Sequence, residues 1–349
     1  MTSLVTPTLD ELGGWPAVLG PLTLGHALPA DHARAAMAEI LAGSATPAQI
    51  AGFIVALRMK GETVDELAGL LDAMASAAER VPLADVSGVV DIVGTGGDRS
   101  HSVNVSTMAS LVIAGAGVRV CKHGNRAASS RCGSADLLES LGVNLEVDPA
   151  GVVRCVEEAG IGFCFAPRFH PAMRHAVPTR RELGIPTVFN LLGPLANPAG
   201  VRRQVVGVAD PAMADRMAQV LTARGSERAM VVFGDDGLDE LTTTTTSTIV
   251  EVVDGELQRT TVHPEALGLT IVEPKALVGG SADANAAVAR SVLAGEPGPA
   301  RDVVLLNAAA GLVVSGACDD LESGIAVART AIDNGAAELA LARLVELSR

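Results

Sequence analysis

The sequence predicts an α/β protein in which a small helical N-terminal domain precedes a large, doubly wound domain with a mainly parallel sheet. Residues 29–80 carry apolar side chains at helical spacing, as Ile50, Ile54 and Leu57 illustrate. From residue 89 onward, short apolar runs alternate with longer helical segments, which is typical of strands joined by crossover helices. With 349 residues, the chain is also long enough to form two domains.

The N-terminal part is expected to contain a loose arm at residues 1–20 and three helices within 29–80. The first is expected to begin at Pro29 and Asp31 and to end at Gly43. The second and third are each expected to begin with a capping box, formed by Thr46 with Gln49 and by Thr63 with Glu66. Small helical domains of this kind commonly pack against another copy, so we expect a homodimer through this domain. Packing of the same apolar face on the chain's own large domain is the alternative.

The second part carries the alternation of strands and helices. Strands are expected at 89–94, 118–121, 163–166, 203–208, 229–233, 248–253 and 302–306. Helices are expected at 105–116, 134–141, 149–159, 210–224, 281–294 and 319–347. A polar, basic segment with prolines, 168–183, interrupts this order and is expected to form short helices that rejoin the helical domain. We therefore predict a helical domain at 1–85 with inserted helices at about 168–185, an α/β domain at 86–349, and a cleft between them.

Two loops that suit phosphate follow neighbouring strands. The first strand ends at 94–98, GTGGD, where glycines permit positive φ and exposed N–H groups can form an anion-binding nest. Ser106 or Thr107 is expected to cap the following helix, whose N-terminus attracts anions. The second strand ends at 122–126, before a run of small residues. Because ligands of open α/β sheets bind at this edge, we predict a phosphate site there, with a plain tight turn as the alternative.

The glycine loop fits neither of two common nucleotide-binding motifs. A Walker A loop would need Lys and then Ser or Thr after the last glycine. A dinucleotide fingerprint would need glycine at the position of Arg99. The loop therefore predicts a phosphate ligand outside these two classes.

An adjacent acidic pair, Asp239-Glu240, follows a strand of the predicted sheet. Carboxylates in this place suit Mg²⁺, which takes oxygen ligands and usually keeps several waters and phosphate oxygens. A solvated acidic turn is the alternative for the pair. We assign the preceding Asp235 and Asp236 to such a turn.

Composition narrows the classes of function. A net charge of −14 argues against binding to nucleic acid or to anionic membranes. Five cysteines without C-x-x-C spacing predict reduced thiols rather than a disulfide framework. The N-terminus lacks the pattern of a signal peptide, and no stretch of about 18 apolar residues predicts a membrane span. We therefore expect a cytoplasmic protein.

Six segments resemble one enzyme family in residues, order and spacing: GTGGD, NVST, KHGNRAASS, GSADLLE, RRELGIPTVFNLLGPLANP and GLDELTTTTT. On these segments the chain, from about residue 22 to its C-terminus, resembles the anthranilate phosphoribosyltransferases, although GTGGD alone would also suit nucleoside phosphorylases. The resemblance implies a nucleoside phosphorylase/phosphoribosyltransferase type of fold and an enzyme of tryptophan biosynthesis. It implies transfer of the phosphoribosyl group of 5-phosphoribosyl 1-diphosphate (PRPP) to the amine of anthranilate, with release of diphosphate.

The resemblance also implies Mg²⁺ as cofactor and a set of site residues, without a general base. Residues expected to bind PRPP are Gly94, Gly97, Asp98, Ser102, Asn104, Val105, Ser106, Thr107, Lys122, His123, Gly124, Asn125, Arg126, Ala127, Ala128, Ser129, Ser130 and Ser134. Residues expected to face anthranilate are Gly94, Asn125 and Arg180; a guanidinium fork matches the anthranilate carboxylate, and the resemblance selects Arg180 over Arg181. Residues expected to hold the metal are Ser106, Asp239 and Glu240.

The chain departs from the family at Arg131-Cys132, where many relatives carry a basic residue followed by a small hydroxyl residue; the role of Cys132 stays open. Two other functions also stay open. A pyrimidine nucleoside phosphorylase would share the architecture, and RRELGIPTVFNLLGPLANP speaks against it. A non-enzymatic relative that binds nucleic acid is disfavoured by the net charge of −14 and by the intact Asp239-Glu240 pair.

Overall fold

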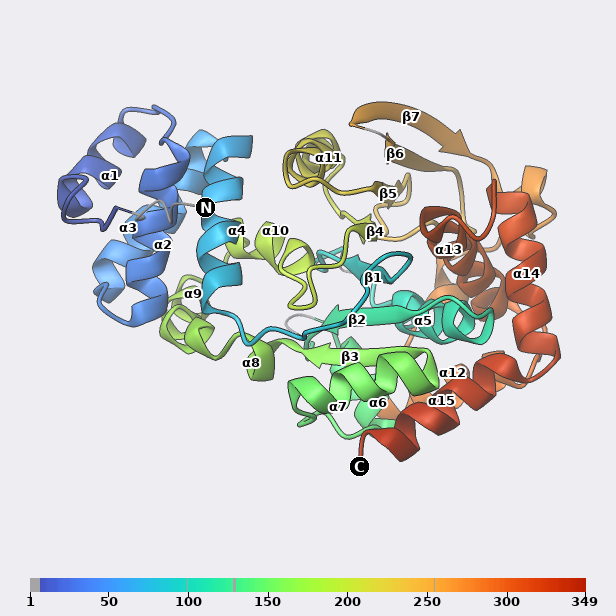
Figure 1. The fold of residues 1–349 in the computed structure, drawn as a ribbon. Helices are drawn as coiled ribbons and strands as arrows, with labels where there is room; N and C mark the ends of the chain where they lie inside the picture. Colours follow the sequence, from blue (N-terminus) through green and yellow to red (C-terminus); the bar gives the residue numbers. More distant parts are fainter. Residues whose placement is uncertain (1–6, 99, 128–129, 254) are drawn as a thin grey trace. The chain divides into compact units, whose positions relative to one another are not determined.

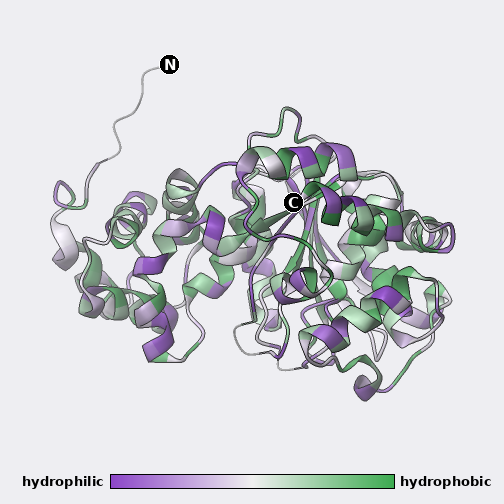
Figure 2. Cartoon of the chain, turned by 90° about the horizontal axis from the view of Figure 1, so that it is seen from below, coloured by the Kyte–Doolittle hydropathy of each residue, from purple (hydrophilic) through white to green (hydrophobic). Residues whose placement is uncertain are grey.

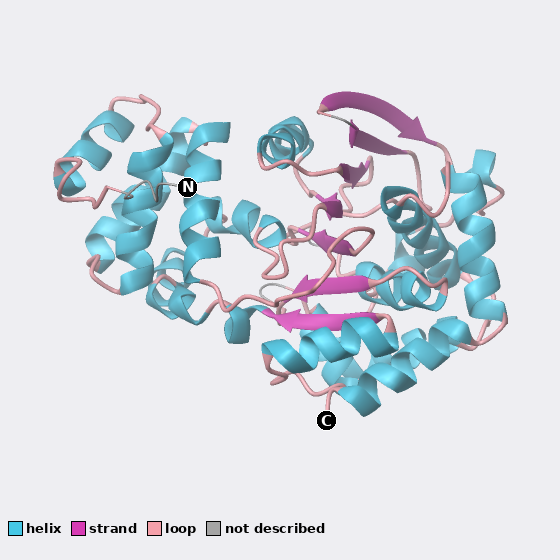
Figure 3. Cartoon of the chain, in the orientation of Figure 1, coloured by secondary structure: helices cyan, strands magenta, loops and turns pink. Residues whose placement is uncertain are grey.

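The chain divides into two compact units (Figure 1). The computed structural model describes residues 7–98, 100–127, 130–253 and 255–349. The first unit draws on Met1–Arg80 and Pro167–Ala196, and the second on Val81–Ala166 and Asn197–Arg349. All strands of the described chain belong to the second unit, whereas the first is helical (Figure 3).

The three helices predicted within residues 29–80 are confirmed, and so are both capping boxes. The first unit contains α1 (Gly14–Thr23), α2 (Ala30–Ala42), α3 (Pro47–Lys60) and α4 (Val64–Ala77), followed after the crossing by α8 (Ala166–Phe169), α9 (Val177–Leu183) and α10 (Val188–Leu195). Glu66 is fully buried and also accepts a hydrogen bond from the backbone N–H of Leu28, 2.8 Å away. The second capping box therefore also ties α4 to the segment that precedes α2.

The prediction of a loose arm over residues 1–20 is wrong for its described part, because α1 begins at Gly14. The ring of Trp15 packs edge-on against Phe53 of α3, with 6.0 Å between the ring centroids. Val18 and Leu22 are buried on the same helix. Glycines and prolines weaken the local helical signal there, and burial against α3 overrides it.

The sheet of the second unit has seven strands in the order β3-β2-β1-β4-β5-β6-β7. Their bounds are Val90–Gly94 (β1), Val120–Gly124 (β2), Ile161–Phe165 (β3), Arg203–Gly207 (β4), Arg228–Gly234 (β5), Ser247–Val253 (β6) and Glu256–Val262 (β7). The first five strands are parallel, and β6 and β7 are antiparallel. The predicted doubly wound, mainly parallel sheet is confirmed, and its strand order reverses between β1 and β4.

The helices of the second unit are α5 (Val105–Gly115), α6 (Ser134–Ser140), α7 (Pro149–Arg154), α11 (Ala214–Ala223), α12 (Ala282–Leu293), α13 (Pro299–Ser315), α14 (Leu321–Asp333) and α15 (Ala336–Leu347). Helices α5, α7, α11, α13 and α15 contact strands, whereas α12 and α14 pack on other helices. A π-helical turn, Cys155–Ala159, extends α7. The helix predicted at 319–347 is broken in two, because Gly335 takes a left-handed conformation with φ 78°. In Figure 2 many helices of the chain carry both green and purple segments, the pattern of helices with one apolar face.

One predicted strand is wrong, and one strand was missed. Residues 302–306 lie inside α13, whose apolar residues are buried, and a short buried apolar run does not distinguish helix from strand by its periodicity. Strand β7 was not predicted, because ELQRTTV lacks an apolar face and is exposed except at Val262. It forms by pairing with β6 at the sheet edge. Among the described residues, no helix combines the length and apolar character needed to cross a membrane.

Candidate active site

The carboxyl ends of β1 and β4 lie side by side at the point where the strand order reverses. Gly94, the last residue of β1, is paired in register with Gly207, the last residue of β4. Beyond these glycines the pairing continues, since the N–H of Thr95 donates to the carbonyl of Gly207 at 2.9 Å. Open α/β sheets bind their ligands at such a switch point. The predicted glycine loop therefore starts at the expected edge of the sheet.

The acidic pair beyond β5 reaches back to this edge. Oδ2 of Asp239 accepts a hydrogen bond from the N–H of Gly96 at 2.7 Å, and Oε1 of Glu240 accepts one from the N–H of Ser106 at 3.3 Å. Both carboxylates are only 8% exposed, so the alternative of a solvated acidic turn is wrong for this pair. Residues predicted from two distant segments are thus brought together.

Two glycines make room for Asp239. A Cβ atom at Gly94 would lie 2.4 Å from Oδ2 of Asp239, and a Cβ atom at Gly207 would lie 1.7 Å from its carbonyl oxygen. Neither approach is sterically possible for another residue type. Gly207 was missed in the sequence, although a glycine ending a buried strand at this edge is a usable signal.

The glycines of the loop itself serve its conformation. Gly96 has φ 67° and Gly97 has φ 84°, both in the left-handed region. Asp98 accepts a hydrogen bond from the Ser100 hydroxyl, whose oxygen accepts one from the N–H of Ser102 at 3.1 Å. Ser102 also forms an isolated bridge to Val278. The far end of the loop is thus held by local turns and by the segment before α12.

The acidic pair has other carboxylates close to it, and this affects its pKa values. Burial, together with nearby Asp98, raises the pKa of Asp239 to about 7. Burial and the neighbouring Asp239 raise the pKa of Glu240 to about 8, against the opposing effect of Lys122. The protein groups around Asp239 and Glu240 do not fully compensate the negative charge of the two carboxylates. This favours the binding of a cation there.

Lys122 and His123 lie within β2, because the strand extends to Gly124 and the predicted end at residue 121 is wrong. Lys122 is 1% exposed, and its Nζ donates to the carbonyl of Ile92 and to Oγ of Ser106 at 3.3 Å. Burial lowers the pKa of Lys122, and Asp91 and Glu240 oppose this effect. A lysine is accommodated here because a carbonyl and a hydroxyl oxygen accept hydrogen bonds from its ammonium group and the charges of Asp91 and Glu240 favour its protonated form.

The N-terminus of α5 differs from the prediction. Asn104 occupies the cap position without a side-chain capping bond, so Ser106 and Thr107 lie in the first turn and neither caps the helix. Buried Val105 is the first residue of the helix. Oδ1 of Asn104 and Oγ1 of Thr107 are buried without a hydrogen-bond partner among the described residues. Both atoms can serve a ligand that carries hydroxyl groups.

The second loop follows β2 and ends at Ser134, the first residue of α6. It is tied to the N-cap of α5, because Nδ2 of Asn104 donates to the carbonyl of Cys132 at 3.0 Å. Within the loop, the hydroxyl of Ser130 donates to the same carbonyl at 3.3 Å. A Cβ atom at Gly124 would lie 2.6 Å from Oγ of Ser134. The predicted Ala128 and Ser129 lie outside the described residues.

A buried polar group below the second loop was missed in the sequence. Asp91 accepts hydrogen bonds from the N–H of His123 at 3.2 Å and from Nδ2 of Asn197 at 2.8 Å. Asn197 also donates to the carbonyl of Cys121 at 2.8 Å. Burial raises the pKa of Asp91 to about 6, against the opposing effect of Lys122. An acidic residue inside the apolar run VVDIV was the available signal.

Arg180 lies on α9 of the first unit. Its guanidinium carbon is 4.8 Å from the centroid of the Phe189 ring, and the side chain is partly buried, whereas Arg181 is exposed. Burial lowers the pKa of Arg180. The two neighbouring arginines therefore differ in environment, and only Arg180 is held by an aromatic face.

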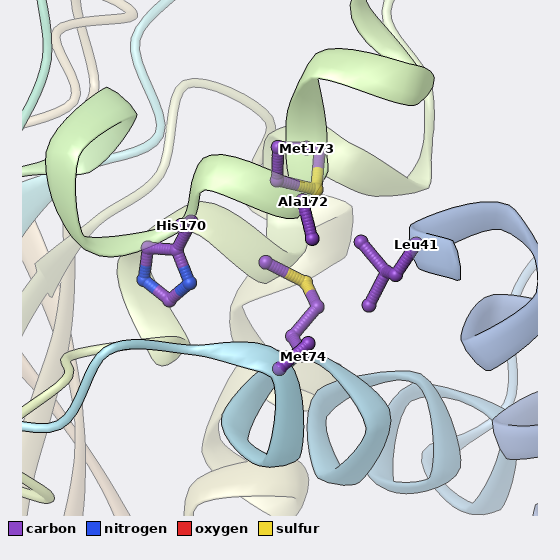
Figure 4. Close-up of a pocket in the computed structure, with 6 residues that line it drawn as sticks. Leu41, Met74, His170, Ala172 and Met173 are labelled. Atoms are coloured by element: carbon purple, nitrogen blue, oxygen red, sulfur yellow. The ribbon is translucent and has the colours of Figure 1, made fainter. Parts of the chain in front are cut away.

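A small pocket of the first unit is lined by Leu41, Met74, Ala77, His170, Ala172 and Met173 (Figure 4). Nε2 of His170 is 2.9 Å from the carbonyl oxygen of Ala196, so this histidine has a structural hydrogen bond. The pocket has no space that a water molecule could occupy, whereas ligand pockets commonly measure roughly 300–1,000 Å³. It contains none of the predicted site residues.

Comparisons with known proteins agree with this architecture. Residues 16–78 match the helical bundle domain of a glycosyl transferase family, and residues 86–338 match the α/β domain of that family. An anthranilate phosphoribosyltransferase of Rhodococcus opacus (strain B4) is 56% identical over 340 residues, which cover 96% of this chain and 93% of that protein.

Solved structures of the same name are also similar. The enzyme from Thermus thermophilus has 46% identity and a TM-score of 0.90, with 95% of this chain and 99% of that one covered. The Saccharomyces cerevisiae enzyme in complex with PRPP and Mg has 28% identity and a TM-score of 0.84, with 97% and 96% covered. Its complex with 4-fluoroanthranilate has 26% identity and a TM-score of 0.86, with 96% and 97% covered. The chain belongs to the anthranilate phosphoribosyltransferase family.

Proposed function

We propose that this chain transfers the phosphoribosyl group of PRPP to the amine of anthranilate, giving N-(5-phosphoribosyl)anthranilate and diphosphate, as a step of tryptophan biosynthesis. The observation that carries the proposal is the contact between the buried acidic pair and the glycine loop, in which Asp239 accepts the N–H of Gly96 at 2.7 Å. A metal site and a phosphate loop thereby share one sheet edge. The names of the relatives supply the two substrates.

The residues fit Mg²⁺. Asp239 and Glu240 are buried, and their raised pKa values reflect burial and repulsion from a neighbouring carboxylate, Asp98 for Asp239 and Asp239 for Glu240, which a divalent cation would relieve. No group of three or more His, Cys, Asp or Glu side chains that could hold a metal occurs among the described residues. Mg²⁺ commonly uses one or two carboxylates together with phosphate oxygens and water, so this pair suits a metal that also contacts the donor. We assign Ser106, Asp239 and Glu240 to it.

We assign the donor to the two loops and the N-terminus of α5. The residues are those that the family resemblance implies: Gly94, Gly97, Asp98, Ser102, 104–107, 122–130 and Ser134. Their N–H and hydroxyl groups suit phosphate and ribose oxygens, and the unpartnered oxygens of Asn104 and Thr107 suit ribose hydroxyls. When bound, Mg²⁺ supplies positive charge to the departing diphosphate.

The groups assigned to the donor also stabilise the transition state of the proposed transfer. The bond between C1 of the ribosyl group and the diphosphate oxygen breaks as the bond to the amine nitrogen forms, and a ribosyl centre develops oxocarbenium character as glycosyl centres do. Fixed backbone N–H donors stabilise the negative charge that develops on the leaving group. Because the aromatic amine is neutral and already nucleophilic, orienting it contributes more than deprotonating it. We therefore assign no general base.

We assign the carboxylate of anthranilate to Arg180, and further contacts of the acceptor to Gly94 and Asn125. The partly buried guanidinium of Arg180, held over Phe189 at 4.8 Å, supports this choice over exposed Arg181. Its planar fork suits two parallel hydrogen bonds to a carboxylate.

A homodimer through the first unit is also proposed. Leu24, which follows the last residue of α1, and Met59 of α3 are large apolar residues that are 73% and 83% exposed in the single chain. Exposed apolar side chains on one helical unit favour contact with a second copy. Light scattering of the purified protein tests this, and a monomer at micromolar concentration would contradict it.

Loss of anthranilate fluorescence tests the proposed function. We expect the fluorescence to fall only when PRPP and Mg²⁺ are both present, with stoichiometric release of diphosphate. Incubation with a pyrimidine nucleoside and inorganic phosphate is the control for a phosphorylase. Phosphorolysis of the nucleoside without consumption of anthranilate would overturn the proposal.

A further inference from the structure

Asp136, on the first turn of α6, holds both ends of the loop that follows β2. Its Oδ2 accepts hydrogen bonds from the backbone N–H of Ala127 and from that of Gly133, each 2.9 Å long. Its Oδ1 accepts one from Nη1 of Arg126 at 2.9 Å. One carboxylate thus connects three residues of a single loop.

Part of this arrangement is ordinary helix capping. Gly133 is the cap residue of α6, and an acidic side chain three residues later often bonds the cap N–H. Capping does not explain the bonds to Ala127 and Arg126, which lie before the helix, at the other end of the loop. These two bonds close the base of the loop.

Gly133 makes this closure possible. A Cβ atom at Gly133 would lie 2.4 Å from the backbone nitrogen of Ala127 and 2.7 Å from the carbonyl oxygen of Asn125. The two ends of the loop therefore touch through backbone atoms. The N–H of Ala135 donates to that same carbonyl of Asn125 at 3.1 Å, which adds a further bond across the base.

The Arg126 side chain belongs to the same base. Besides Asp136, it contacts Glu139 through two hydrogen bonds of 2.7 and 3.1 Å, and its guanidinium carbon lies 5.5 Å from the centroid of the Phe165 ring. Burial raises the pKa of Asp136, but the bonds from Ala127, Gly133 and Arg126 lower it overall, which favours the ionised acceptor. The hydrogen bond from Arg126 likewise lowers the pKa of Glu139.

We propose that Asp136 is a positioning residue for the donor loop: by joining Arg126, Ala127 and Gly133, its carboxylate keeps the described ends of that loop, 125–127 and 130–133, in the arrangement that receives PRPP. This inference rests on the proposed function, because it concerns the binding of the donor. It narrows the donor role proposed above for Arg126, because it assigns the Arg126 guanidinium to the base of the loop rather than to the phosphates of PRPP. Asp136 itself touches no substrate in this assignment.

The test compares four proteins: wild type, Asp136→Ala, Gly133→Ala and Glu139→Gln. Asp136→Ala removes all three bonds at the base, and Gly133→Ala separates the two ends while Asp136 stays in place. We expect both to raise the KM for PRPP by about 10- to 100-fold, since small displacements of binding groups are costly. The KM for anthranilate should change little. Glu139→Gln is the matched control, because it weakens only the outer contact of Arg126 and should leave both KM values near those of wild type.

A second measurement can overturn the proposal on the wild type alone and extends to the near-isosteric variant Asp136→Asn. Hydrogen exchange of the wild type should show slow exchange at the amides of Ala127 and Gly133, and the same amides should exchange faster in Asp136→Asn at the same pH. Fast exchange of both amides in the wild type would overturn the proposal. A wild-type KM for PRPP in folded Asp136→Ala, or equal rises in both KM values, would also overturn it. A wild type without turnover of PRPP and anthranilate would instead refute the proposed function, and the inference with it.

Discussion

Asp239 accepts a 2.7 Å hydrogen bond from the backbone N–H of Gly96, although the two residues are 143 positions apart in the sequence. This bond joins the acidic turn after β5 to the glycine loop after β1. One oxygen of the proposed metal ligand therefore also fixes the loop assigned to the diphosphate. Changes at either residue should affect metal and donor together.

Replacing Asp239 by Asn and Glu240 by Gln should lower Mg²⁺-dependent turnover by about 100-fold or more, because the charge that holds the cation is lost. The variant should be more stable than wild type at pH 8.5 without metal. Both carboxyl groups have a raised pKa in the folded state, about 7 and about 8, so folding opposes their ionisation. Stability is then lost as pH rises toward those values, and the neutral amides avoid that loss.

The measurements for this variant are turnover against Mg²⁺ concentration and the melting temperature in EDTA at pH 8.5. Asp235→Asn, at an exposed carboxylate of the same turn, is the matched control and should keep its Mg²⁺ dependence. A double variant with the Mg²⁺ dependence of wild type would show that the metal lies elsewhere.

Gly207→Ala should unfold or inactivate the protein, because the new Cβ would lie 1.7 Å from the carbonyl oxygen of Asp239. The expected destabilisation is about 3 kcal/mol or more. Gly96→Ala is the matched control, since no atom lies within 4 Å of a Cβ there and only the positive φ of 67° is unfavourable. That strain costs about 1–2 kcal/mol. Urea unfolding of both variants checks the order, and a more stable Gly207→Ala would contradict the packing described.

Arg180→Ala should reduce kcat/KM for anthranilate far more than the affinity for PRPP. Removing the charge-assisted partner of a buried carboxylate costs about 2–5 kcal/mol of binding free energy. Arg181→Ala is the control, because it removes a neighbouring charge that is exposed. Aniline, which lacks the carboxylate, should be a poor acceptor for wild type and should lose little further in Arg180→Ala. Equal losses for aniline and anthranilate would mean that Arg180 orders the site rather than reads the carboxylate.

His170 should make the first unit less stable at acidic pH. Burial lowers its pKa below the ordinary value of 6.5, and the hydrogen bond to Ala196 only partly opposes this. The folded chain then binds fewer protons than the unfolded chain below pH 6.5, so stability is present above that pH and falls as pH decreases, by at most about 1.4 kcal/mol per pH unit.

Urea unfolding at pH 8, 6.5 and 5.5 measures this effect. His170→Gln should flatten the decline relative to wild type, because the amide carries no titrating proton. His26→Gln, at an exposed histidine, is the control and should follow the wild-type curve. An unchanged slope in His170→Gln would assign the acid sensitivity to other groups.

Local chemistry made several features predictable from the sequence. Both capping boxes are formed by residues three positions apart, so Thr46 with Gln49 and Thr63 with Glu66 were recognisable without any tertiary contact. The glycine loop was predictable because glycines directly after a buried strand have few other uses, and Gly96 does take a positive φ. The main architecture followed from the alternation of strands and helices, which reflects local periodicity.

Other features depend on contacts between distant segments, and only the tertiary structure decided them. Helix α1 owes its place to burial against α3, β7 to pairing with β6, and the helical state of residues 302–306 to a core that surrounds them. The burial of Asp239, the space left for it by Gly207, and the closure of the second loop by Asp136 also belong to this class. The sequence determined which chemical groups are present and where the chain turns. Long-range packing decides which groups are buried together in a low-dielectric environment. It therefore decides which carboxylates need a cation, and a local sequence pattern does not contain this information.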